Sequence, residues 1–135
     1  MTWRLSALLA MAAIATLVVS GGGDGSSARA TVAIRYSRFT PEVITVPAGV
    51  PVTITLRNDD PIEHEWIVGP PEVHKRHRTG TEQVHAGVPT EVTVPAFSTR
   101  VTTLTFEKAA DYAYICHLPG HEDYGMAGTL RILER

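Results

Sequence analysis

The sequence predicts an all-β protein, an antiparallel β-sandwich of about eight short strands packed in two sheets. From Thr31 onward, apolar β-branched residues alternate with polar ones, as in VTITL at 52–56, and this period of two is typical of strands with one face in a core. Turn signals rich in Pro, Gly, Asn and Asp separate the runs. No amphipathic helix of ten or more residues is apparent after residue 30, so a helical or α/β fold is not expected.

The strand assignment follows these alternating runs in chain order. Turn signals stand at PAGVP (47–51), NDDP (58–61) and VGPPE (68–72), where Pro and Gly favour chain reversals. Short strands that are regularly separated by such turns indicate a sandwich of two sheets. The expected strands are residues 31–37, 43–48, 52–58, 64–68, 92–96, 100–107, 112–116 and 126–133.

The N-terminal segment differs in composition from the rest of the chain. Arg4 precedes an apolar run of about fifteen residues (5–19) and a Gly/Ser-rich passage, and this run is shorter than the roughly twenty residues of a comfortable bilayer span. The run is followed by Ala28-Arg29-Ala30, an A-x-A pattern that a signal peptidase could cut. We expect residues 1–30 to be a signal peptide or an uncleaved anchor with a flexible tether, and residues 31–135 to be one folded domain.

Composition and charge limit the classes of function. With 135 residues, of which 44% are hydrophobic, the chain can form one packed domain. The net charge is −2, and no basic run is longer than KRHR at 75–78, which argues against a nucleic-acid-binding protein because that class needs a broad cationic face. The N-terminal segment predicts export to the periplasm or the cell exterior, with membrane contact only through an uncleaved anchor.

Export makes the cysteine content informative. Cys116 is the only cysteine of the chain, whereas thiols in an oxidising compartment are usually paired. It does not follow the apolar run as a lipid-anchoring cysteine would. A buried, unreactive thiol is the simple alternative, but the neighbouring residues favour a metal ligand.

Those neighbours lie in YICHLPGHEDYGMAGTL, residues 114–130. A strand that ends at Cys116, a reversal at Pro119-Gly120 and a second turn before Met126 would bring the thiol, the imidazole of His121 and the thioether together. These are soft ligands, and a second imidazole would complete the two-His, one-Cys plane with a weak axial Met that holds copper for electron transfer. His64, at the start of an expected strand, is the candidate, although local spacing alone does not prove that it meets Cys116.

The pattern Y-x-C-x-x-P-G-H-x-x-x-G-M-x-G-x-L in this stretch, with a histidine upstream, resembles the cupredoxins, the blue-copper proteins. The resemblance implies a Greek-key β-sandwich with one type 1 copper per chain at one pole. It makes His64, Cys116 and His121 the equatorial ligands and Met126 the axial ligand. It also implies a monomeric electron carrier rather than an enzyme, which docks transiently with redox protein partners near His121.

Two departures from related patterns qualify this resemblance. Glu65 follows His64 where many cupredoxins have Asn, and Asn58 in the preceding turn is the expected substitute. The segment is also similar to the type 1 segment of multicopper oxidases, but Ile115 precedes Cys116 where those enzymes have a histidine. The alternative function is an exported copper-binding protein for copper storage, delivery or sensing.

The segment 69–90 interrupts the strand pattern and carries His74, His77 and His85. The i, i+3 spacing of the first two could let them share a metal ion on one helical turn. The basic residues of KRHR (75–78) would repel a cation, so a solvated surface loop with at most one helical turn is the preferred interpretation. A second metal site is the alternative.

Overall fold

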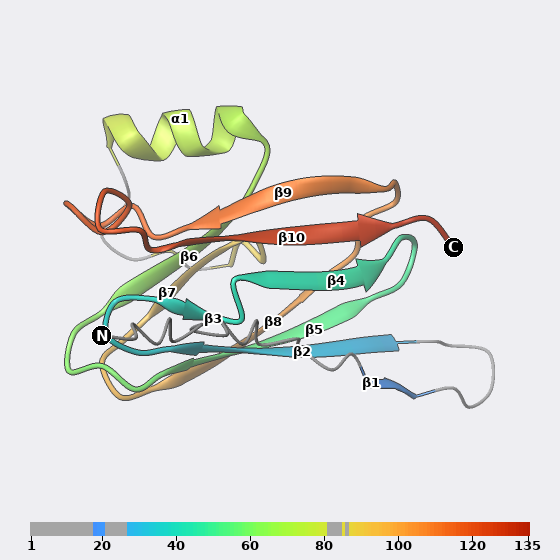
Figure 1. Cartoon of the computed structure of the whole chain (residues 1–135), viewed down its shortest axis with the longest axis horizontal. Helices are drawn as coiled ribbons and strands as arrows, with labels where there is room; N and C mark the ends of the chain where they lie inside the picture. Colours follow the sequence, from blue (N-terminus) through green and yellow to red (C-terminus); the bar gives the residue numbers. More distant parts are fainter. Residues whose placement is uncertain (1–17, 21–26, 81–84, 86) are drawn as a thin grey trace, which may run out of the picture.

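The computed structural model describes residues 18–20, 27–80, 85 and 87–135, and two five-stranded sheets pack face to face (Figure 1). Of the expected signal peptide or anchor, residues 1–30, positions 1–17 and 21–26 lie outside the described residues. The first sheet has the order β1-β2-β5-β8, with β3 paired to β2. Its strands are β1 (Val18–Ser20), β2 (Ser27–Ile34), β3 (Phe39–Thr40), β5 (Val52–Asn58) and β8 (Thr99–Leu104).

The second sheet has the order β4-β10-β9-β6-β7 and carries the helix of the described residues on its outer side (Figure 1). The helix is α1 (Pro71–Thr79). The strands are β4 (Val43–Pro47), β6 (His64–Gly69), β7 (Glu91–Val94), β9 (Ala110–Ile115) and β10 (Ala127–Leu133).

The predicted all-β sandwich is confirmed, and all eight expected strands are present. Each sheet also contains one parallel pair, β2 with β5 and β10 with β4, so the pairing is mixed rather than wholly antiparallel. The chain crosses from one sheet to the other between β3 and β4 and returns at β5, so strands of the same direction become neighbours. The short strands β1 and β3 carry too few residues for the period of two to be recognised.

Strand β2 begins earlier than the sequence pattern predicts. It starts at Ser27 and includes Ala28, which is fully buried and paired with Val52 of β5. The A-x-A motif therefore lies inside a paired strand, and cleavage after Ala30 would remove residues 27–30 from the sheet. The strand ends before Tyr36 and Ser37 because both have positive φ angles and form a turn.

The core fills the space between the two sheets with alternate residues of the strands. Trp66 is fully buried in this core. It belongs to β6, where every residue is buried. A strand at the face of a simple sandwich would expose alternate residues, so the outer face of β6 must also be covered.

The covering element is the segment between β6 and β7. Ile67 and Ile115 are paired across β6 and β9 and are buried on the outer face. Helix α1 packs against β6, and His74 of this helix lies within 3.1 Å of the Gly69 and Ala113 carbonyl oxygens of the sheet. The described part of the segment is therefore a packed cover with a nine-residue helix, and the expected solvated loop is wrong.

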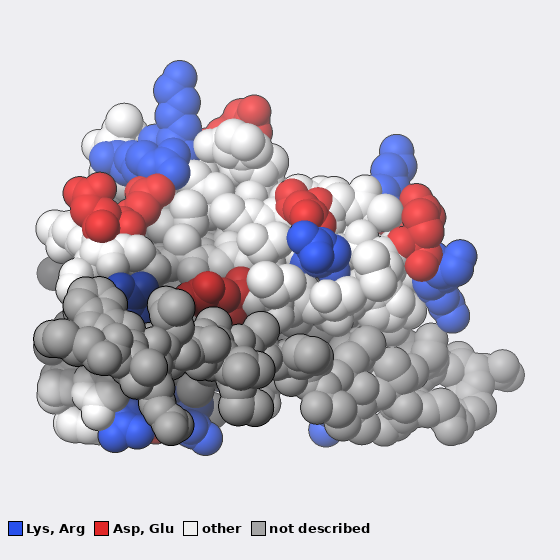
Figure 2. All heavy atoms as spheres, in the orientation of Figure 1, with Lys and Arg blue, Asp and Glu red and all other residues white. Residues whose placement is uncertain are grey.

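Charged side chains of both signs are mixed on the described surface shown in Figure 2, and no broad cationic area is visible there. Several charged side chains of the described residues form pairs, such as Arg131 with Asp111 and Arg78 with Glu122. Among the described residues, no helix is long and apolar enough to cross a membrane.

Candidate metal centre

The four residues that the sequence analysis selected as metal ligands lie at one pole of the sandwich. His64 is the first residue of β6, and β6 runs antiparallel to β9, so His64 lies near the end of β9. Cys116 directly follows β9, and Met126 directly precedes β10. His121 lies in the loop between these two strands, at the left of Figure 1. Strand order therefore brings together residues that are up to 62 positions apart, from 64 to 126.

Three donor atoms converge at this pole. His121 Nδ1 lies 3.3 Å from Cys116 Sγ and 3.3 Å from His64 Nδ1. All three ligand atoms lie within 4.8 Å of one another. Ligand atoms that surround one ion at about 2.0–2.3 Å are themselves roughly 3.3–3.6 Å apart, so the observed separations fit a single bound metal ion.

Asp60 orients the ring of His64. Its Oδ2 lies 2.9 Å from His64 Nε2, and its carboxylate also accepts hydrogen bonds from the backbone N–H groups of Tyr36 and Ser37. Burial opposes ionisation of Asp60, but these hydrogen bonds and His64 outweigh it and lower its pKa. An ionised carboxylate only accepts, so the proton of His64 stays on Nε2 and the lone pair of Nδ1 faces the site. The sequence analysis missed Asp60.

The thiol of Cys116 is fully buried. The backbone N–H of Glu65 donates to its sulfur at 3.4 Å. Burial is the main cause that raises the pKa of Cys116 to about 11, so the thiolate needs a nearby positive charge to form at neutral pH. A metal ion supplies that charge, and the donor set of one thiol and two imidazoles suits copper.

The loop that carries His121 is fixed by backbone hydrogen bonds. Met126 N donates to His121 O at 3.0 Å, and Cys116 N donates to Met126 O at 3.2 Å. Met126 is fully buried. Gly120 and Gly125 have positive φ angles, which explains why both turns of this loop use glycine.

Asn58, the expected substitute for the asparagine that many cupredoxins have after the upstream histidine, joins two segments of the chain through its side chain. Its side-chain amide lies within 3.1 Å of three carbonyl oxygens, and its Oδ1 accepts from Asp60 N at 2.9 Å. It therefore holds the turn before His64 to the end of β7, and none of these side-chain contacts is with the loop that follows Cys116. The three carbonyl groups are those of Ile62, Val94 and Pro95.

The histidines of segment 69–90 form a second cluster, on the outer face of β6 and β9. His74, His77 and His85 are 3%, 5% and 7% exposed, so the sequence-based expectation of solvated histidines is wrong. His117 joins them: its ring stacks on His77 with centroids 5.7 Å apart, and its Nε2 lies 2.9 Å from His74 Nδ1. The unbroken apolar run WIV (66–68) was the sequence signal that both faces of β6 are covered.

The fold agrees with the comparisons with known proteins. A profile described as "Cupredoxin-like domain" matches residues 7–130. The chain belongs to this cupredoxin-like family. A protein named "Copper-resistant cuproprotein CopI" from Rubrivivax gelatinosus is 34% identical over 115 residues, which cover 80% of this chain and 69% of that protein.

Another relative and two solved structures are also similar to this chain. A protein of the same name from Pseudomonas aeruginosa is 27% identical over 126 residues, which cover 70% of each chain. The structure of dithionite-reduced auracyanin from Roseiflexus castenholzii matches with a TM-score of 0.66 and 18% identity, over 82% of this cupredoxin-like chain and 99% of the other. Auracyanin A of Chloroflexus aurantiacus, titled a "blue" copper protein, matches with a TM-score of 0.63 and 24% identity, over 78% and 98%. At these identities the solved structures establish the fold.

Proposed function

We propose that this cupredoxin-like protein is exported, binds one copper ion in a type 1 site, and carries single electrons. The proposed equatorial ligands are His64, Cys116 and His121, and Met126 is the proposed axial ligand. The observation that supports this most strongly is the convergence of two Nδ1 atoms and one buried sulfur, with 3.3 Å between neighbours. Copper, when bound, supplies a one-electron couple between Cu(II) and Cu(I).

The chain's own residues keep this site rigid. Asp60 fixes the ring and tautomer of His64, and the N–H of Glu65 stabilises negative charge on the Cys116 sulfur. The backbone hydrogen bonds around Met126 fix the loop that carries His121. The donor set mixes soft sulfur, which favours Cu(I), with imidazole, which suits both oxidation states. Because this rigid donor set lies between the preferences of Cu(I) and Cu(II), it needs little rearrangement when copper gains or loses an electron.

Exposed aromatic residues near the pole support transient docking of a redox protein partner. Tyr36 and Phe97 are 71% and 72% exposed. Both are held near His64 through Asp60, because Tyr36 N donates to its carboxylate and Phe97 N donates to its backbone carbonyl. Exposed apolar area beside a metal ligand suits a small, short-lived interface.

A copper-handling protein is the second candidate, and the names of the relatives are compatible with it. Both relatives are named copper-resistant cuproproteins, which fits storage, delivery or sensing of copper as well as it fits electron transfer. The electron self-exchange rate of the copper-loaded protein separates the two candidates. Fast self-exchange supports the carrier, whereas slow exchange combined with release of copper to a copper-free acceptor protein supports copper handling.

The proposed axial position gives a direct prediction. Met126→Gln replaces a thioether by a harder oxygen donor and should lower the reduction potential while copper is retained, because the thioether favours Cu(I). Redox titration of both proteins, followed by visible absorption, measures the change. The matched control is Leu130→Met, which alters a buried residue of β10 outside the proposed ligand set and should leave the potential close to that of the wild type. An unchanged potential in Met126→Gln would mean that Met126 only packs the core.

A further inference from the structure

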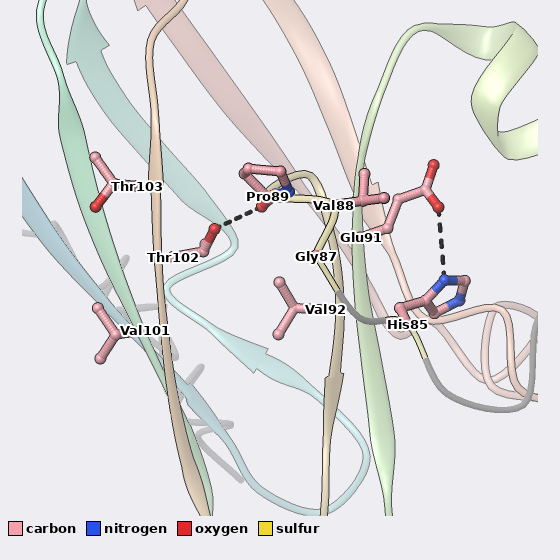
Figure 3. Close-up of a pocket in the computed structure, with 9 residues that line it drawn as sticks. All are labelled: His85, Gly87, Val88, Pro89, Glu91, Val92, Val101, Thr102 and Thr103. Atoms are coloured by element: carbon pink, nitrogen blue, oxygen red, sulfur yellow. Dashed lines mark hydrogen bonds and ion pairs between the residues drawn. The ribbon is translucent and has the colours of Figure 1, made fainter.

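The second histidine cluster contains a compact group of three possible metal ligands. His77 Nε2 lies 3.4 Å from Glu91 Oε2, and His85 Nδ1 lies 3.5 Å from the same oxygen. One ligand atom from each of the three residues lies within 4.8 Å of the other two. Figure 3 shows the Glu91 carboxylate and the His85 ring pointing toward each other.

These separations fit a shared ion better than hydrogen bonds. Contacts of 3.4–3.5 Å between the nitrogen and oxygen atoms exceed the usual 2.7–3.2 Å of an N–H···O bond. Ligand atoms arranged tetrahedrally at about 2.0–2.1 Å from one ion are roughly 3.3–3.4 Å apart. The distances between Glu91 and the two histidines are close to that value.

The tautomer of His77 is already suitable for a metal ligand. Its Nδ1 lies 2.8 Å from the Val73 carbonyl oxygen one helical turn earlier, and a carbonyl oxygen can only accept, so Nδ1 carries the proton. In the neutral ring, Nε2 then has a free lone pair directed at the Glu91 carboxylate. Two acceptor atoms that face each other in a buried position are stabilised by a cation between them.

Neighbouring residues orient the other two ligands. Arg76 donates to Glu91 Oε1 at 2.7 Å, which leaves Oε2 toward the histidines. His85 Nε2 lies 3.3 Å from Glu65 Oε1, so a carboxylate stands behind the imidazole, as is common for metal-bound histidines. Arg78 is occupied by Glu122. Two of the basic residues that were expected to repel a cation, Arg76 and Arg78, are therefore paired with acidic residues.

The group is reachable from the surface. A pocket of about 330 Å³ lies between β7 and β8 and includes His85 and Glu91 in its lining (Figure 3). The two histidine side chains are 4% and 1% exposed, and Glu91 is 14% exposed. A buried pair of imidazoles with a carboxylate at a pocket wall leaves space for water as a fourth ligand, as in open metal sites.

We propose that His77, His85 and Glu91 form a second metal site that binds a divalent transition metal ion, Cu(II) or Zn(II). Imidazole and carboxylate ligands suit these ions, and the ligand set lacks the sulfur of the Cys116 site. At two places, the residue that follows a ligand of the Cys116 site contacts a histidine of the second site. His64 is followed by Glu65, which contacts His85, and Cys116 is followed by His117, which stacks on His77.

Copper stoichiometry tests this second site. We expect the metal-free full chain, dialysed against Cu(II), to bind two equivalents. The Cys116 site should account for an intense visible band, and the second site should add a copper EPR signal without such a band. In the double variant His77→Gln/His85→Gln, we expect one equivalent and an unchanged visible band.

His74→Gln is the matched control, because His74 is another buried histidine of α1 but lies outside the three-residue ligand group; it should still bind two equivalents. Far-UV circular dichroism checks the fold of each variant. If the double variant unfolds, Glu91→Gln is used instead, because it keeps the shape of the side chain. It should weaken the binding of the second copper equivalent at least about tenfold. The proposal would be overturned if the wild type bound only one copper equivalent while showing the full visible band. It would also be overturned if the folded ligand variants bound the second copper equivalent as tightly as the wild type. A missing visible band with a second equivalent that still depends on His77 and His85 would refute only the Cys116 site.

Discussion

Replacement of Cys116 by serine is expected to abolish the intense visible band of the copper-loaded protein. That band requires charge transfer from a thiolate to Cu(II), and Cys116 is the only cysteine of the chain. The fold should survive, because serine is close to cysteine in size and its hydroxyl can accept the hydrogen bond that Glu65 N now donates to the sulfur. We expect a loss of about 1–3 kcal/mol in the free energy of unfolding from burial of the hydroxyl.

The control for this variant is His117→Gln. His117 directly follows Cys116, but its ring contacts His74 and His77 of the outer cluster and the Glu122 carboxylate. It is not a proposed ligand of the Cys116 site, so the visible band should persist. Visible absorption of both copper-loaded variants, with circular dichroism as a check on folding, makes the comparison. A band that remains in Cys116→Ser would show that another group supplies it.

Gly128→Ala is expected to destabilise the protein by about 3 kcal/mol or more, because it forces atoms into a filled core. Gly128 of β10 is paired with Tyr114 of β9, and the Tyr114 ring lies over the glycine. A Cβ atom at Gly128 would lie 2.2 Å from Tyr114 Cζ and 2.4 Å from its Cε2 and hydroxyl oxygen. The ring cannot easily move, since it packs against Phe39 and Trp66.

Chemical denaturation of the wild type and the variant measures this effect. A double-mutant cycle provides the control: in a Tyr114→Leu background, Gly128→Ala should cost less than about 1 kcal/mol, because the ring that it meets is absent. Ala127→Gly, one residue earlier in β10, tests the general cost of a backbone change in this strand. A Gly128→Ala protein as stable as the wild type would contradict the close approach of the ring.

The sequence predicted those parts of the fold that depend on local pattern. The alternation in VTITLRN gave β5 its exact bounds, Val52–Asn58, and the spacing from Cys116 to Met126 predicted their approach because only two short turns separate them. His64 was a candidate because it begins an expected strand, and its assignment as a ligand depended on the family resemblance. Its meeting with Cys116 depends on the pairing of β6 with β9, which is a long-range contact that no local pattern encodes.

The second histidine cluster shows where sequence reasoning failed. His74 and His77 lie in a polar stretch, and polarity indicates solvent exposure when a segment is considered alone. The structure buries them because their partners come from distant strands: His117 follows β9, and Glu91 begins β7. Asp60 was missed for a similar reason, since its role depends on the contacts of its carboxylate with Tyr36, Ser37 and His64.

The EPR spectrum of the protein loaded with one equivalent of Cu(II), recorded together with its visible absorption, tests the central claim most directly. A thiolate and two imidazoles around copper should give an intense sulfur-to-copper band and a small copper hyperfine splitting from the same ion. The proposed ligand set of His64, Cys116 and His121 with Met126 predicts both features at this first equivalent. A colourless copper adduct with a large hyperfine splitting at this first equivalent would contradict the proposed type 1 site.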